Sequence, residues 1–340
     1  MRDPGKRWLV IGLLGIVVGC LPAVARGAEV VIAYSTPSAW ANWGAVLSEF
    51  TKESGIQAPS DLKTSGTAMA AMIAEKDRPQ GDATYFGISF GIEAARRGLV
   101  ENYKPKNWDR VPGGLKDPGG AWFTIHTGAI SFNVNRDALG KVAVPRGWND
   151  LLKPEYKDLV TIQSPITTFT GYVAFLAANV SLGGTVENWD PGMAYFKKLK
   201  DNGLRIEKTT SYAKMLKGEI GVHVEFDANG YRARHKDGGN VDVVIPEEGS
   251  LYLPYVMVLI KGAPHAENGK KFLDFLLSES AQRLWAEGFV RPVLSNVMTA
   301  EQRSKFLPEA AYARVKSVDF VKVADLMSNF HTRWRTEFGD

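Results

Sequence analysis

The sequence has a single cysteine, Cys20, among its 340 residues, so no disulfide can form within the chain. Its five histidines are scattered and lack the short spacings that zinc ligands show. There is no Walker A sequence, no G-x-G-x-x-G and no H-E-x-x-H. The sequence therefore offers no metal centre and no nucleotide loop, and we expect neither enzymatic activity nor a cofactor.

A strong excess of one charge is also missing. Lysine and arginine number 41 and aspartate and glutamate number 37. Most of the difference lies in residues 1–27, and the remainder is close to neutral. This balance argues against nucleic acid as a partner, because a nucleic-acid-binding surface needs a basic stripe.

The only long apolar run, WLVIGLLGIVVG (8–19), is short for a membrane span. It follows Lys6 and Arg7 and precedes the small residues 23–25, as in a secretory signal peptide. We therefore expect residues 1–27 to be a signal peptide and the mature protein to be periplasmic. The alternative is lipidation at Cys20, because residues 17–20 resemble a bacterial lipoprotein box. Small and apolar residues continue to Ala25, which favours cleavage.

Beyond the signal, short β-rich runs alternate with helical runs. Strands fit 29–35, 81–89, 128–135, 159–164, 218–226, 241–246 and 255–262, and helices fit 38–54, 89–97, 169–182, 189–200, 265–278 and 279–288. This alternation predicts an α/β fold with helices covering largely parallel sheets. Because no low-complexity linker interrupts the chain, we expect two lobes joined by hinge strands.

Two polar turns, one in each half of the chain, open predicted helices. Ser65-Gly66-Thr67 is the first, and the second lies in SPITTFTGY (164–172). A third, YSTPSAW (34–40), ends the first strand in a similar way. Helix N-termini present unpaired N–H groups and partial positive charge, and glycine allows close approach. Such turns suit an anion held between lobes, although a hydroxyl cap often satisfies only its own helix.

The order of several segments resembles a known family. These segments are VVIAYSTPSAW, TSGTAMAAMIAEKDRPQGDATYFG, GGAWFTIHTGAISFNVN, PRGWNDLLKPEYKDLVTIQSP, LKGEIGVHVEF and LIKGAPHAENGKKFLDFLLSESAQ. They are similar to the periplasmic solute-binding proteins of ABC importers, in the cluster that binds ferric iron, polyamines and phosphonates.

The resemblance implies two Rossmann-like lobes that close on a ligand. We place lobe 1 at 28–127 plus 250–295 and lobe 2 at 128–249 plus 296–340, with approximate boundaries. It also implies a monomeric receptor without catalysis, which delivers a small solute to a membrane permease and its ATPase.

The resemblance also implies site residues. In family members that bind phosphorylated or phosphonate solutes, the matching turns grip the anion. Here these turns carry Thr36, Ser65, Gly66, Thr67, Thr168, Thr170 and Gly171. Glu225 and Asp227 would then meet an ammonium at the far end of the ligand, and Trp40 would lie over it. A charge effect at a helix start is the plainer explanation for the acidic pair, and packing is the plainer explanation for Trp40.

The sequence thus favours a small organic anion bearing a phosphate or phosphonate, including a zwitterion. Iron(III) is the first alternative, but the ferric branch carries two consecutive tyrosines where this chain has Ala228-Asn229. A polyamine held by Glu225, Asp227 and Trp40 is the second. A sensory receptor with the same fold is the third.

Overall fold

The computed structural model describes Met1 and residues 29–339. The predicted signal peptide, apart from Met1, lies outside the described residues. No helix among those described combines the length and apolar character needed to cross a membrane.

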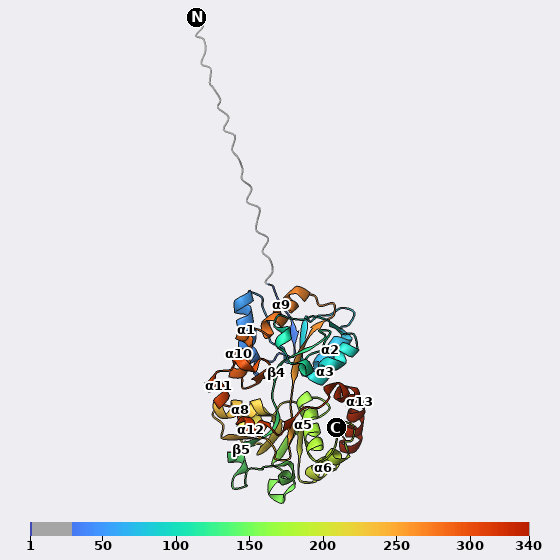
Figure 1. The fold of residues 1–340 in the computed structure, drawn as a ribbon, viewed down its shortest axis with the longest axis vertical. Coiled ribbons are helices and arrows are strands. Elements are labelled where there is room, and N and C mark those ends of the chain that lie inside the picture. The colour runs from blue at the N-terminus through green and yellow to red at the C-terminus, as the bar shows by residue number, and fades with distance from the viewer. Residues whose placement is uncertain (2–28, 340) are drawn as a thin grey trace.

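The strands form two large sheets that belong to two bodies, stacked one above the other in Figure 1. In the first sheet the order is β1-β2-β11-β4-β12, with β3 also beside β11. In the second the order is β7-β6-β8-β5-β9. We call the bodies lobe 1 and lobe 2. The strands of lobe 1 are β1 (Ala33–Tyr34), β2 (Ala83–Gly87), β3 (Val100–Glu101), β4 (Phe123–Thr127), β11 (Tyr255–Ile260) and β12 (Arg291–Pro292). Those of lobe 2 are β5 (Ile130–Asn135), β6 (Val160–Gln163), β7 (Arg205–Glu207), β8 (Val222–Phe226) and β9 (Val241–Val244).

Helices cover both sheets, as expected for an α/β fold. Around lobe 1 lie α1 (Trp43–Ser54), α2 (Ser65–Ala74), α3 (Ile88–Arg96), α9 (Ala266–Leu276) and α10 (Glu279–Glu287). Around lobe 2 lie α4 (Arg136–Leu139), α5 (Phe169–Ser181), α6 (Asp190–Asp201), α7 (Tyr212–Leu216), α8 (Asp227–His235) and α13 (Phe320–Phe338). The short helices α11 (Ala300–Ser304) and α12 (Glu309–Tyr312) lie on the segment that leads back to lobe 2.

The sheets are mixed rather than largely parallel, which corrects the expectation from the sequence. Strand β11 is antiparallel to β2 and β4, and β5 is antiparallel to β8 and β9. The parallel pairs in these two sheets are β1 with β2, β6 with β7 and β6 with β8. The reason is that β5 and β11 each enter their sheet directly from the other lobe. They therefore run against neighbours that end at the lobe boundary.

Three crossings connect the lobes. The chain passes from β4 to β5, returns between β10 (Ser250–Leu251) and β11, and crosses again between β12 and α13. The crossings are bonded to one another: the Leu253 N–H donates to the Gly128 carbonyl at 2.9 Å, and the Tyr252 N–H donates to the Lys316 carbonyl at 3.0 Å. Strand β13 (Val315–Lys316) pairs with β10. We call this bundle the hinge, and the lobe boundaries given above stay a prediction.

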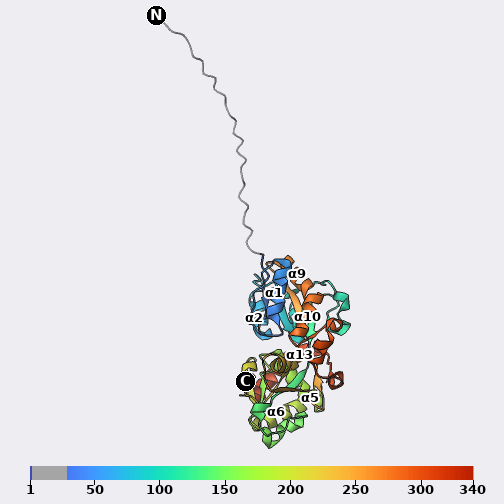
Figure 2. The same cartoon turned by 90° about the vertical axis from the view of Figure 1, so that its left-hand side faces the viewer.

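Helix α13 completes the core of lobe 2 and also reaches lobe 1. Its Phe330 ring stacks on Tyr172 of α5 at 4.6 Å between centroids, and Trp334 is fully buried. Nearer its start, Asp325 forms an ion pair with Arg96 of α3 at 2.6 Å. Figure 2 shows α13 at the level where the two bodies meet. One helix therefore packs against both lobes.

Candidate functional site

The first polar turn forms the start of α2, with Thr64 rather than Ser65 as its cap. The Thr64 hydroxyl accepts from the Thr67 N–H at 3.3 Å, and the Thr67 hydroxyl accepts from the Thr64 N–H at 2.8 Å. The Ser65 hydroxyl accepts from the N–H of Gly87, at the end of β2, at 3.1 Å. All three hydroxyls thus have partners within lobe 1. The N–H groups of Ser65 and Gly66 belong to the first turn, which has no intrahelical acceptors.

The second polar turn starts α5 in the same manner. The Thr168 hydroxyl accepts from the Gly171 N–H and donates to the Ser164 carbonyl, both at 3.0 Å. A Cβ on Gly171 would lie 2.3 Å from the Gln163 carbonyl oxygen. Glycine at 171 therefore lets the helix pack on the end of β6, which differs from the expected role of leaving room for a ligand.

The two turns face each other across the lobe boundary. A Cβ on Gly66 would lie 3.4 Å from the Thr167 carbonyl oxygen. The Thr170 hydroxyl lies 3.0 Å from the Tyr255 hydroxyl, at the start of β11 in lobe 1. The structure thus brings together the two helix starts that the sequence singled out, with their positive dipole ends converging.

Because the hydroxyls are engaged in caps, their removal should affect stability first. We expect Thr67→Val and Thr168→Val each to lower the free energy of unfolding by about 0.5–2 kcal/mol. Ligand affinity should change little, since the backbone N–H groups remain. Thermal melts and calorimetry on both variants test this. Unchanged melting with a large loss of affinity would instead show that the hydroxyls bind ligand directly.

Thr36 is buried in its own turn. Its hydroxyl donates to the Ala33 carbonyl at 3.0 Å, and its carbonyl accepts from the Ser60 hydroxyl at 2.9 Å. Thr36 is fully buried. Thr36 therefore supports the loop that leads to Trp40. Its hydroxyl is bonded within lobe 1 and does not point toward lobe 2.

Trp40 belongs to a cluster of rings between the lobes. Its Nε1 donates to the Tyr85 hydroxyl at 3.1 Å, and its ring centroid lies 5.4 Å from Phe226 of lobe 2. Tyr85 stacks on Tyr255 at 4.9 Å, and the Tyr85 hydroxyl lies 2.8 Å from His126 Nε2. Burial lowers the pKa of His126 to about 3, so the ring is neutral and shares one hydrogen bond with the Tyr85 hydroxyl through Nε2.

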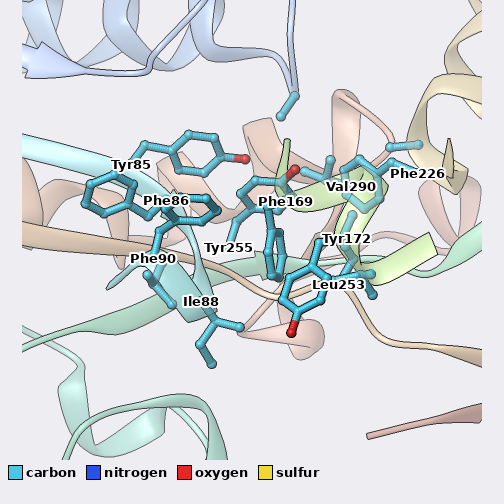
Figure 3. Close-up of a cluster of buried hydrophobic side chains, with 14 of the residues drawn as sticks. Tyr85, Phe86, Ile88, Phe90, Phe169, Tyr172, Phe226, Leu253, Tyr255 and Val290 are labelled. Atoms are coloured by element: carbon cyan, nitrogen blue, oxygen red, sulfur yellow. The ribbon is translucent and has the colours of Figure 1, made fainter. Parts of the chain in front are cut away.

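Phe169, the first residue of α5, inserts from lobe 2 into this cluster (Figure 3). Its ring meets Tyr255 edge-on at 5.6 Å between centroids. A Cβ on Gly87 of lobe 1 would lie 2.0 Å from Phe169 Cγ and 2.6 Å from its Cβ. The missing side chain of Gly87 therefore provides the slot that the Phe169 ring fills when the lobes are in contact.

Glu225 is fully buried near the end of β8. Its Oε2 accepts from Gln163 Nε2 at 3.2 Å and from Asn229 Nδ2 at 3.0 Å. Its Oε1 lies 2.8 Å from His223 Nδ1, but the two atoms lack hydrogen-bond geometry. Oε1 has no hydrogen-bond partner among the described residues. A buried carboxylate oxygen in this state is costly unless a donor completes it.

Asp227 has a different place from its neighbour. Its Oδ1 accepts from the Ala129 N–H at 3.0 Å, and its Oδ2 accepts from the Tyr312 hydroxyl at 2.7 Å. Burial raises the pKa of its carboxyl. Both partners belong to the hinge region, so Asp227 ties α8 to the hinge and does not join Glu225.

A small pocket of about 60 Å³ lies at the rim of the lobe contact, beside this cluster. Asn42 and Phe289 line it from lobe 1, and Asn229, Arg232 and Lys236 line it from lobe 2. Arg232 donates through Nη1 to the Ala39 carbonyl, across the lobe boundary, and through Nε to Asp237 at 2.9 Å. Two cations at the rim favour the approach of an anion.

The expectations from the sequence passed over several of these residues. Tyr85, His126, Phe169, Gln163 and Arg232 belong to the contact between the lobes but carry no local motif. The expectations from the sequence also missed a G-x-S-x-G pattern at Gly87–Gly91. Ser89 at its centre is fully buried and its hydroxyl has no hydrogen-bond partner among the described residues. It lies within α3 and is fully enclosed, unlike the exposed serine on the strained turn of a nucleophile elbow.

Comparison with known proteins places these features in a family. Residues 81–323 match the model of the family described as bacterial extracellular solute-binding protein. The chain belongs to this family. Its members bind small solutes and work with an ABC permease and ATPase. They are binding proteins rather than enzymes, which supports the expectation of no catalysis.

Relatives of this solute-binding protein differ in their ligands. It is 30% identical, over 75% of each chain, to a putative 2-aminoethylphosphonate-binding periplasmic protein of Salmonella typhimurium. It is 26% identical, over 74% of each chain, to the spermidine/putrescine-binding periplasmic protein of Escherichia coli. The periplasmic binding protein AfuA of Actinobacillus pleuropneumoniae, solved with exogenous fructose 6-phosphate, matches with a TM-score of 0.80 and 26% identity. That match covers 93% of this chain and 99% of AfuA. The recognition of the family and the two-lobed fold are thereby confirmed.

Proposed function

We propose that this protein is the periplasmic receptor of an ABC importer for a small zwitterion that carries a phosphonate or phosphate and an ammonium group. Among such ligands, 2-aminoethylphosphonate fits best. The observations that carry the proposal are the buried Glu225 carboxylate, whose Oε1 makes no hydrogen bond among the described residues and lies 2.8 Å from His223 Nδ1, and the two helix starts that meet across the lobe boundary.

The anionic end is assigned to the two helix starts. The N–H groups of Ser65 and Gly66 on α2 and those of the first turn of α5 would donate to the phosphonate oxygens. Thr67, Thr168 and Gly171 hold these turns in shape, and Thr170 contacts Tyr255 between them. Such charge-assisted bonds need no buried lysine or arginine.

The ammonium end is assigned to Glu225. The ammonium would donate to Oε1, while Gln163 and Asn229 keep Oε2 satisfied and the carboxylate oriented. Trp40 packs from lobe 1 against Phe226, the residue after Glu225, and its ring would offer a cation–π contact to the ammonium. Asp227 is left out of the proposed ligand contacts because both its oxygens are bonded to hinge groups.

The relatives support a phosphorus oxyanion as the ligand's acidic group. The Salmonella typhimurium relative is named for an aminoalkyl phosphonate, and AfuA was solved with a sugar phosphate. This chain shares 30% and 26% identity with them, respectively. The two ligands have in common an oxyanion that backbone N–H groups can bind.

A polyamine is the second candidate, because Glu225 and Trp40 suit an ammonium and a polyamine-binding relative exists. A diamine needs an acidic partner at each end, however, and Asp227 is engaged in the hinge. Iron(III) is less favoured still: burial raises the pKa of Tyr85 and Tyr255, which disfavours the ionised phenolates that iron needs. The described residues also bring no three His, Cys, Asp or Glu side chains together as a ligand set.

A calorimetric panel tests the proposed function. We expect 2-aminoethylphosphonate to bind at least tenfold more tightly than ethylphosphonate, ethanolamine or putrescine, because only the zwitterion satisfies both ends. Ferric citrate should produce no visible tyrosinate absorption. Tight putrescine binding would favour the polyamine function, and a protein-dependent visible band that a chelator removes would favour iron. A pull-down with this protein as bait separates transport from sensing. Capture of an ABC permease would support transport, and capture of a signalling protein would support sensing.

A further inference from the structure

A second cavity lies on the hinge, apart from the contact described above. Its volume is about 410 Å³, within the roughly 300–1,000 Å³ of small-molecule sites. Thr127, Tyr252 and Pro254 line it from two of the crossings, and Ser317 lines it from the third. We call it the hinge pocket. None of the residues that line it belongs to the proposed ligand site.

The lining is mostly apolar and contains one charged side chain. Leu115, Pro254, Val293 and Met298 are among the apolar residues, and Arg291 is the charge. A concave apolar surface with one cation suits an apolar body that carries a single anionic group.

Arg291 has free donor capacity. Its guanidinium carbon lies 3.6 Å from the ring centroid of Tyr312 and 5.2 Å from that of Phe306, so two aromatic rings pack against the group. Its Nε is buried and has no hydrogen-bond partner among the described residues. The guanidinium as a whole is a planar cation that suits a carboxylate or sulfonate.

One buried acid, Asp227, interacts with this cation through its charge. The Asp227 oxygens accept from Ala129 and Tyr312, as described above. Glu309 meets Arg291 Nη1 at 3.3 Å, but the Glu309 side chain is 83% exposed. Such a surface pair contributes little, so a ligand anion can replace it.

We propose that the hinge pocket binds a small amphipathic monoanion, a carboxylate or sulfonate on an apolar body of about ring size, and that its occupancy favours the closed lobes. The coupling follows from the walls. They come from all three crossings, whose relative positions must change when the lobes separate, so a ligand fitted to the present shape stabilises lobe contact. This inference does not depend on the identity of the cleft ligand.

Fluorescence titration with 1-anilinonaphthalene-8-sulfonate tests the site on the full mature protein. We expect saturable binding of one equivalent, displaced by benzoate, and a loss of affinity of at least tenfold in Arg291→Gln. Arg291→Lys keeps the charge but loses the planar guanidinium, so its affinity for the probe should lie between those of wild type and Arg291→Gln. Arg283→Gln removes an exposed arginine and should change nothing. Equal affinity in wild type and both Arg291 variants would overturn the site, as would displacement by 2-aminoethylphosphonate, which would place the probe in the cleft.

A separate measurement tests the coupling between the hinge pocket and ligand binding in the cleft. Saturating benzoate should tighten the binding of the cleft ligand identified in the calorimetric panel several-fold in wild type and not in Arg291→Gln. The cleft ligand should tighten benzoate binding by the same factor, because linkage is reciprocal. Equal cleft affinity with and without benzoate would overturn the regulatory half of the proposal. If no cleft ligand emerges from the panel, a change in radius of gyration on adding benzoate replaces this readout, and no change overturns it.

Discussion

Replacing Gly87 by alanine should weaken ligand binding by about 5- to 150-fold. The added Cβ would lie 2.0 Å from Phe169 Cγ, which is a clash near the root of that side chain rather than at a flexible end. Overpacking of this kind costs about 1–3 kcal/mol, and each 1.4 kcal/mol is tenfold in affinity. Because the two residues belong to different lobes, the clash raises the free energy of lobe closure. Calorimetry gives the affinity, and small-angle scattering shows whether ligand still compacts the protein.

Rescue distinguishes this mechanism from damage to lobe 1. In a Gly87→Ala, Phe169→Gly double variant every clashing atom of residue 169, including its Cβ, is gone, so the double variant should bind better than the product of the single losses predicts. Gly113→Ala is the matched control, since a Cβ there meets no atom within 4 Å. Additive losses in the double variant, together with a lower melting temperature for Gly87→Ala alone, would mean that Gly87 acts within lobe 1.

Glu225→Gln should discriminate between ligands. Loss of a hydrogen bond to a charged group costs about 1.5–3 kcal/mol, so 2-aminoethylphosphonate should bind about 10- to 150-fold more weakly. Ethylphosphonate, which lacks the ammonium, should be nearly unaffected. Calorimetry with both ligands on both proteins measures the difference directly.

Two other carboxylates serve as controls for Glu225. Asp227→Asn alters a buried group bonded to the hinge, so it should lower the melting temperature and affect both ligands equally. Glu219→Gln alters an exposed residue just before β8 and should change neither property. If Glu225→Gln weakens both ligands to the same degree, the carboxylate shapes lobe 2 and does not bind an ammonium.

The sequence was most informative where a local pattern reflects local structure. Alternating strands and helices predicted the α/β class, and capped helix starts with nearby glycines marked α2 and α5. Those two starts do face each other, as the Gly66 and Thr167 contact shows. Their binding of a ligand stays a prediction.

The sequence was less informative about which polar groups already have partners. Thr36 and Asp227 have the right chemistry for ligand contacts, but Ala33, Ala129 and Tyr312 occupy them. A residue's type does not show whether a distant backbone group will meet it. The Tyr85 and His126 pair illustrates the converse, because strands 41 residues apart bring these side chains together.

Strand direction was also beyond local patterns, whereas the last helix was missed although a local pattern marks it. The antiparallel entry of β5 and β11 depends on the order of crossings, which no window of sequence contains. The sequence expectations assigned no helix to α13, although its buried positions, among them Val323, Phe330 and Trp334, share one face.

The place of α13 has a consequence for when the protein folds. Its Phe330 and Trp334 fill the centre of lobe 2, yet they come from the last turns of the last helix in the chain. The core of lobe 2 is therefore incomplete until α13 docks, and contacts between residues as far apart in sequence as Tyr172 and Phe330 form slowly. For a chain that is exported, as we propose, we expect this delay to lengthen the time during which the chain stays loosely folded.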